Sequence, residues 1–231
     1  MPHPLDNPFW TALRELHGAF AQGAGEVLRY PPDIAPFVAI AHPGVAVDEA
    51  LDALLPDREP AVMLGLAPAA LSSRWRLDPP EQLAQMTCDV HLPVPDGPPI
   101  LPLQDATRQA DARALTALVY PHYFRPRTMA LGRYFGIYLP DDSGQARLAA
   151  MIGERLGGAG CRELSAICTH PDFTSRGLAR RLTAWLANRL QDEGLQPFLH
   201  VSHGNLRARA LYQGMGFRTR RDLPLWRIGR A

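Results

Sequence analysis

The chain contains no lysine, because all 24 of its basic residues are arginine. Any mechanism that needs a lysine side chain is therefore excluded. We interpret the exclusive use of arginine as the coding bias of a GC-rich, bacterial genome. The length of 231 residues allows one large domain or two small ones, with a sizeable core in either case.

Cysteine is scarce as well. Cys88, Cys161 and Cys168 are odd in number and form no C-x-x-C pair. Their number and spacing argue against a disulfide scaffold or a zinc site and favour a reducing compartment. We therefore expect no metal in this protein.

Long apolar runs are missing too. No run approaches the ~20 residues that a bilayer-spanning helix needs, and the first residues lack the basic and apolar regions of a secretory signal. These absences predict a cytoplasmic protein that has no membrane partner.

Charge is distributed unevenly along the chain. Residues 1–97 hold 5 Arg and 13 acidic residues (net −8), whereas residues 98–231 hold 19 Arg and 10 acidic residues (net +9). A basic half suits an anionic ligand. Most of these arginines follow helical patterns with few aromatics between them, and no nucleic-acid-reading motif occurs, so we expect no nucleic-acid partner.

A segment with five prolines, Leu92–Pro102, predicts a boundary between an N-terminal α/β region (1–97) and a C-terminal domain (98–231). The patterns before and after it predict short elements. The expected helices span 8 to about 23, 47–55 and 106–118, and the expected strands span 26–30, 37–41, 61–66, 83–90, 100–103, 134–139 and 146–154.

One stretch, residues 163–180, organises the C-terminal half. Its apolar run over 164–168 predicts a buried strand, and leucines at helical spacing predict a helix from about Arg176 to Asp192. Between them, Thr174–Ala179 presents successive backbone N–H groups at a helix N-terminus. Such a turn is suited to binding phosphate.

A second motif lies downstream, over residues 205–217. It reads N-x-x-A-x-x-L-Y-x-x-x-G-F, and a strand-like segment, 198–202, separates it from the first motif. Together the two motifs resemble the GNAT superfamily of acyl-CoA-dependent N-acetyltransferases over residues 98 to 231. The resemblance implies an α/β fold with a central mixed sheet flanked by helices. The region 1–97 would then resemble a smaller, reduced GNAT-like half.

The resemblance also implies an acetyl-CoA site. One departure from the family pattern is Thr174, where Gln or Arg is usual; Arg176 or the Thr174 hydroxyl could compensate for it. Asn205 would orient the ligand, although a helix cap alone explains an Asn at this position. The implied cofactor-binding residues are Ile167, Cys168, Thr169, Thr174, Ser175, Arg176, Gly177, Leu178, Ala179, Arg180 and Asn205.

Two catalytic residues follow from the same resemblance. Tyr212 falls on the tyrosine that protonates the departing CoA thiolate, and a packing role is the alternative. Glu163 stands fourteen residues before Gly177, which matches the general-base glutamate of the histone-acetylating branch. Glu154 is a rival base, and an ion pair of Glu163 with Arg155 or Arg162 is the alternative without catalysis.

The acceptor contacts predicted by the resemblance are Tyr123, Phe124, Arg125 and Arg127, in an aromatic and basic loop. The competing interpretation is a surface loop that packs on the N-terminal region. We reject an acyl-enzyme on Cys168, since a small buried cysteine is usually inert.

These features predict an N-acetyltransferase that transfers an acetyl group from acetyl-CoA directly to a primary amine. The acceptor would be a small molecule, an amino acid or a protein. The alternative is a non-catalytic module that binds acyl-CoA as a sensor or regulator. The oligomeric state stays open, a homodimer included.

Overall fold

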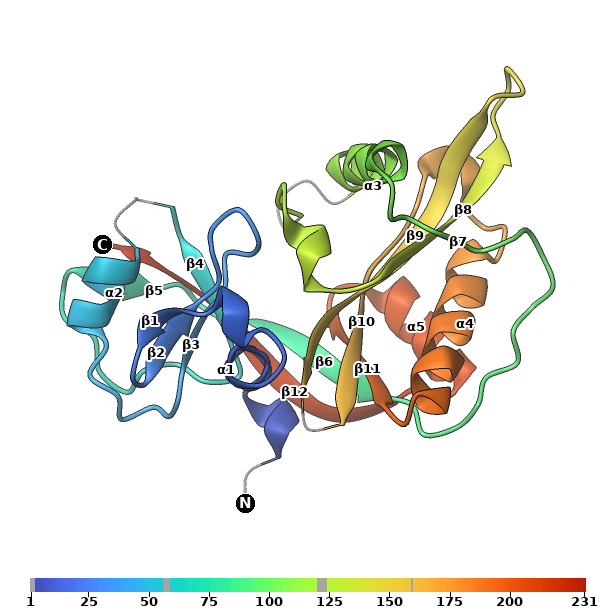
Figure 1. Cartoon of the computed structure of the whole chain (residues 1–231). Coiled ribbons are helices and arrows are strands. Elements are labelled where there is room, and N and C mark those ends of the chain that lie inside the picture. Colours follow the sequence, from blue (N-terminus) through green and yellow to red (C-terminus); the bar gives the residue numbers. More distant parts are fainter. Residues whose placement is uncertain (1–2, 56–58, 120–123, 159) are drawn as a thin grey trace.

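The computed structural model describes residues 3–55, 59–119, 124–158 and 160–231 (Figure 1). None of the helices in these ranges has the length and apolarity that crossing a bilayer requires. The helices are α1 (Pro8–Arg14), α2 (Asp48–Leu54), α3 (Ala106–Val119), α4 (Leu178–Asp192) and α5 (Leu206–Met215). The strands are β1 (Gln22–Ala24), β2 (Val27–Arg29), β3 (Val38–Ile40), β4 (Ala61–Leu64), β5 (Trp75–Leu77), β6 (Glu81–Thr87), β7 (Leu101–Pro102), β8 (Tyr134–Pro140), β9 (Ala146–Gly158), β10 (Cys161–Thr169), β11 (Gln196–Ser202) and β12 (Arg218–Arg230).

A large mixed sheet dominates the fold. Within the described residues it has nine strands in the order β4-β12-β6-β11-β10-β9-β8-β7, and β5 also pairs with β12. Strands β10 and β11 are parallel, whereas the other neighbours in this sheet run antiparallel. A smaller sheet, β1-β2-β3, lies beside β4, to which the chain before β3 is joined by a bridge between Phe37 and Val62. The predicted α/β fold with a central mixed sheet and flanking helices is confirmed.

Helices cover both faces of the large sheet. Figure 1 shows α4 and α5 on one face, and α1 and α3 on the other. Leu182, Leu186 and Leu190 follow α4 at a spacing of four and are fully buried, as an amphipathic helix requires. Each such leucine stabilises the fold by about 1.5–3 kcal/mol relative to exposure. α4 is thereby held firmly against β9 and β10.

The first helix is shorter than the sequence predicts. It was expected to run from Pro8 to about residue 23, but it ends at Arg14. The side chain of His17 is buried instead, where its Nδ1 lies 2.8 Å from the hydroxyl of Tyr30 and its Nε2 lies 3.0 Å from the carbonyl of Leu131. These tertiary hydrogen bonds stabilise a chain path that leaves the helix after Arg14.

The N-terminal region contributes strands to the large sheet. β4, β5 and β6 all precede the proline-rich segment Leu92–Pro102, yet β6 lies between β11 and β12. Side chains of α4 hold the segment in place. Asn188 bonds to the backbone N and O of Leu92 at 2.7 and 2.8 Å, and Arg181 donates to the carbonyls of Pro95 and Pro98. The sheet therefore continues across the predicted boundary.

This continuity leads to a prediction about the fragment 98–231. The fragment lacks β6, so the facing edges of β11 and β12 lose their backbone hydrogen bonds. We expect the isolated fragment to show no cooperative thermal transition by circular dichroism. Co-expression with the fragment 1–97 is the control and should restore one. A cooperative transition of 98–231 alone, near that of the full chain, would contradict the prediction.

Candidate active site

The two parallel strands separate near the middle of the sheet. β10 and β11 pair at only three positions, the last being Glu163 opposite Phe198. Beyond that pair, residues 164–169 of β10 and residues 199–202 of β11 are not paired with each other in the sheet. We call these residues the strand separation. The backbone edges that face each other there can bind an extended ligand.

A β-bulge lies within the strand separation. The ladder between β10 and β9 shifts register between Ser165 and Cys168. Ala166 takes a positive φ of 49°, which is rare for a residue other than glycine. A bulge leaves its extra residue out of the ladder, so backbone groups at 166–167 are free of the ladder with β9. The bulge lies among three of the predicted cofactor-binding residues, Ile167, Cys168 and Thr169.

The loop before α4 has the backbone conformation of an anion-binding turn. Ser175 and Gly177 take positive φ values of 63° and 74°, and α4 then begins at Leu178. The first N–H groups of a helix have no intrahelical acceptor. Successive backbone N–H groups form a concave anion-binding site where right-handed and left-handed backbone conformations alternate. Thr174 departs from the family pattern, and its hydroxyl is already bonded to the carbonyl of Pro171 at 3.1 Å.

Arginines add positive charge around this loop. Arg176 is exposed and stacks over the ring of Phe173, 5.0 Å from its centroid. Arg180 is exposed, and no hydrogen bond or ion pair with another described residue involves it. Arg207 on α5 donates to the hydroxyl of Ser175 at 3.4 Å. Arg180 is therefore the described arginine in this group that is best able to meet an anion.

Tyr212 is a buried residue of α5, the helix that packs against β11 and α4. It belongs to the same large apolar cluster as Leu164 of β10 and Leu199 of β11. Asn205 begins the same helix, where its side chain accepts from the N–H of Ala208 at 3.1 Å. This cap is the interaction that the structure shows for Asn205.

Burial raises the pKa of the Cys168 thiol to about 12. The thiol is nine-tenths buried, and no charged group counteracts the burial. Since the thiolate is the nucleophile, this cysteine is not suited to carry an acyl group at neutral pH.

Glu163 lies in an ion pair rather than at an accessible site. Its carboxylate accepts two hydrogen bonds from Arg155, at 2.8 and 2.9 Å, and one from the backbone N–H of Leu156 at 3.2 Å. Nδ1 of His200 lies 2.7 Å from the same carboxylate. Burial alone would raise the pKa of Glu163, but Arg155 and His200 outweigh it and hold the pKa well below its usual range. Such a group is a poor proton acceptor, so the geometry supports the non-catalytic alternative.

The rival base is engaged in the same way. Glu154 is fully buried and pairs with Arg133 at 2.6 Å and with Arg162 at 3.3 Å. Neither glutamate is therefore available to an incoming amine.

The predicted acceptor loop packs toward the N-terminal region. Arg125 pairs with Glu59, and Arg127 pairs with Asp33 at 3.0 Å. Phe124 meets the ring of Tyr134 edge-on, with centroids 5.8 Å apart. These contacts favour the packing interpretation. Tyr123 lies outside the described residues.

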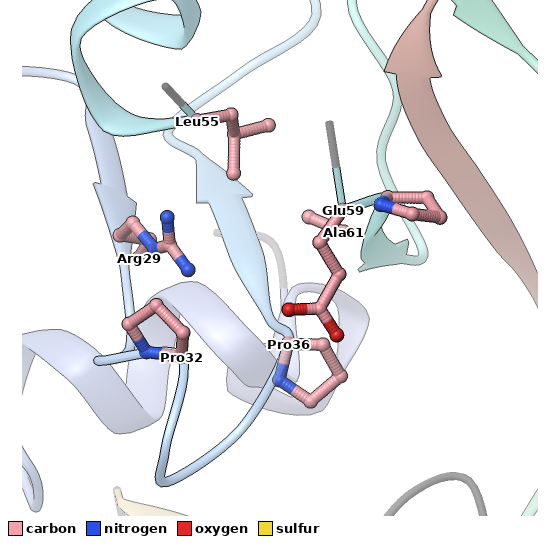
Figure 2. A pocket seen from close by; sticks show the side chains of 7 residues that line it. Arg29, Pro32, Pro36, Leu55, Glu59 and Ala61 are labelled. Carbon is pink, nitrogen blue, oxygen red and sulfur yellow. The ribbon is translucent and has the colours of Figure 1, made fainter. Parts of the chain in front are cut away.

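A pocket also lies in the N-terminal region (Figure 2). Its polar groups already have partners, because Arg29 donates to the carbonyls of Tyr30 and Leu54 and Glu59 pairs with Arg125. None of the residues that line it comes from β10, β11, α4 or α5. They are Arg29, Pro32, Pro36, Leu55, Glu59, Pro60 and Ala61. The described residues also hold no cluster of His, Cys, Asp and Glu suited to a metal ion.

Comparisons with known proteins agree with this arrangement. Residues 135–226 match a family model described as FR47-like protein. A crystal structure from Novosphingobium aromaticivorans DSM 12444, assigned to the GNAT family of acetyltransferases, is 32% identical with a TM-score of 0.87, and the match covers 100% of both chains. No curated protein matches the chain.

Two more distant structures share the fold. A GCN5-related N-acetyltransferase from Kribbella flavida is 17% identical with a TM-score of 0.63, over 94% of this chain and 93% of that one. Another, from Sphaerobacter thermophilus, is 16% identical with a TM-score of 0.52, over 78% and 63%. The fold is that of an N-acyltransferase. The chain belongs to the GNAT family of acetyltransferases.

The ion pair of Glu163 leads to a stability prediction. Glu163→Gln leaves the Arg155 guanidinium without its carboxylate, so the free energy of unfolding at pH 7 should fall by about 3 kcal/mol. Because the pKa of Glu163 is lowered in the fold, its stabilisation is present above the ordinary carboxyl pKa and is lost as the pH falls below it. Urea unfolding should therefore show a smaller difference at about pH 3 than at pH 7.

Glu193→Gln is the matched control for that experiment. Glu193 pairs with Arg133 and Arg189 near the surface, so its loss should cost less than about 1 kcal/mol. A Glu163→Gln variant as stable as the wild type would contradict the structural role of Glu163.

Proposed function

We propose that this protein is an N-acetyltransferase that transfers an acetyl group from acetyl-CoA directly to a primary amine. The amine would belong to a small molecule, an amino acid or a protein. The observation that carries the proposal is the strand separation beside the loop at 174–179, in a chain that belongs to the GNAT family. The helix that carries Tyr212, α5, packs against β11, one side of the strand separation, and against α4, which follows the loop.

In this proposal the CoA pyrophosphate binds the backbone N–H groups of residues 175–179. The dipole of α4 and the charge of Arg180 favour an anion there. Pantetheine pairs with the β10 backbone near Ile167, where the bulge interrupts the ladder with β9. The acetyl group is then placed within the strand separation.

The reaction requires three changes at the acetyl carbon. A backbone N–H of the bulge polarises the thioester carbonyl as negative charge develops on its oxygen. The neutral amine attacks the carbonyl carbon, the new C–N bond forms, and the C–S bond to CoA breaks. The proton on the new ammonium passes to water, because Glu163 and Glu154 are both ion-paired.

The departing thiolate takes a proton from the hydroxyl of Tyr212. The ordinary pKa of a phenol, ~10, is close enough to the ~8.5 of a thiol for useful proton transfer. The high pKa of the Cys168 thiol supports this direct route over an acyl-enzyme.

The experiment is a calorimetric titration of Gly177→Glu with acetyl-CoA. A carboxylate near the pyrophosphate should weaken binding about a hundredfold, since two charges ~5 Å apart repel by ~3 kcal/mol at an effective dielectric of 20. Gly194→Glu is the matched control. Gly194 follows the other end of α4 and has nearly the same φ, 75° against 74°, with open space at its Cβ position. Equal affinities of the two variants would contradict the proposed site.

Tyr212→Phe separates binding from turnover in the same assay. This variant should bind acetyl-CoA as the wild type does, yet release CoA about a hundredfold more slowly in the presence of an amine library. A wild type that binds acetyl-CoA but acetylates no amine would instead favour the sensor function.

A further inference from the structure

A continuous set of hydrogen-bonded side chains crosses four strands of the large sheet. His200 on β11 bonds to Glu163 on β10 at 2.7 Å, and its Nε2 lies 2.9 Å from Nε2 of Gln85 on β6. Arg220 on β12 donates to Oε1 of Gln85 at 2.6 Å. The side chains of Glu163 and His200 are only 1% and 2% exposed, and Gln85 is fully buried. Arg220, at the β12 end of the set, is partly exposed, with 21% of its side chain accessible.

The hydrogen-bond partners of Gln85 determine which ring nitrogen of His200 carries the proton. Its amide nitrogen donates to the carbonyl of Leu5 at 2.8 Å, while its oxygen accepts from Arg220. The amide nitrogen therefore faces Nε2 of His200 as a donor, so Nε2 accepts. The remaining imidazole proton is on Nδ1 and is donated to Glu163. Every polar atom of Gln85 and of the His200 ring is thereby satisfied, and a half-satisfied network would be costly.

The contact between Glu163 and His200 lies where the strands part. Glu163 and Phe198 are the last parallel pair, and His200 stands two residues further along β11. Glu163 also sits in a register shift of β10 against β9, where its carboxylate accepts the N–H of Leu156. One side chain thus joins β9, β10 and β11 at the start of the strand separation.

The N-terminal region covers this contact. The guanidinium of Arg155 lies over the ring of Phe37, 5.3 Å from its centroid. Arg220, which bonds to Gln85, also bonds to the carboxylate of Asp6. With 1% of its side chain exposed, Glu163 is closed to an acceptor amine. Residues 5, 6 and 37 contact the side chains around it, which are Gln85, Arg220 and Arg155.

We propose that Glu163 and His200 are positioning residues that hold β10 and β11 at the spacing the acyl-CoA needs, and that the N-terminal region supports them through Gln85 and Arg220. The ligand part of this inference rests on the proposed function. The claim that these residues hold β10 and β11 in place does not rest on it, because the contact between Glu163 and His200 forms without a ligand.

The test uses two substitutions of His200 in the full-length protein. His200→Leu removes both ring hydrogen bonds, whereas the amide of His200→Asn can still donate from nearly the position of Nδ1. His17→Leu is the matched control, because His17 is also a buried histidine with hydrogen bonds at both ring nitrogens, to Tyr30 and Leu131. Those partners lie outside β10 and β11.

Hydrogen exchange without ligand tests the strands. His200→Leu should accelerate amide exchange at 164–169 and 199–202. The increase in rate there should be at least about tenfold larger than the increase in β8. His200→Asn should restore most of the protection. His17→Leu should cause no such selective change. Exchange that is unchanged, or accelerated equally throughout the sheet, would overturn the proposal.

Calorimetry with acetyl-CoA tests the ligand part. His200→Leu should weaken binding about tenfold, while His200→Asn and His17→Leu should stay within about twofold of the wild type. If the wild type binds no acetyl-CoA, the proposed function fails, and selective exchange would still support the claim that these residues hold β10 and β11 in place. Wild-type affinity in His200→Leu would overturn the claim that this contact sets the spacing for the ligand.

Discussion

The rest of the site depends on the ion pair between Glu163 and Arg155. It ties β10 to β9, and through His200 to β11, at the last position where the two parallel strands are paired. The Glu163 side chain is 1% exposed and that of Arg155 is 21% exposed. Removing a carboxylate from water costs several kcal/mol, so it is tolerated only when its hydrogen bonds are satisfied. Here the backbone N–H of Leu156 and Nδ1 of His200 also bond to the carboxylate, and Gln85 bonds to His200 in turn.

The N-terminal region is part of the same structure. It supplies β6 between β11 and β12, and its acidic residues Asp33 and Glu59 neutralise the arginines of the loop after α3. This pairing accounts for some of the opposite net charges of the two halves. The region therefore shapes the surface of the site as well as the sheet.

The sequence predicted the local elements well because apolar spacing determined them, as in α4. It did not predict β12, whose run of Arg218, Arg220 and Arg221 has little strand character; pairing with strands on both sides decides its conformation. It also placed Glu163 correctly on the central strand but could not show its partners. Arg155, Gln85 and His200 lie up to 115 residues apart in the chain, and no local pattern relates them.

The central claim is that acetyl-CoA binds at the strand separation with its sulfur near Tyr212. A crystal structure of the full chain with CoA tests it most directly. We expect the pyrophosphate on the N–H groups of 175–179, pantetheine beside Ile167, and the CoA sulfur within hydrogen-bond reach of the Tyr212 hydroxyl. CoA bound elsewhere, or a sulfur distant from Tyr212, would contradict it.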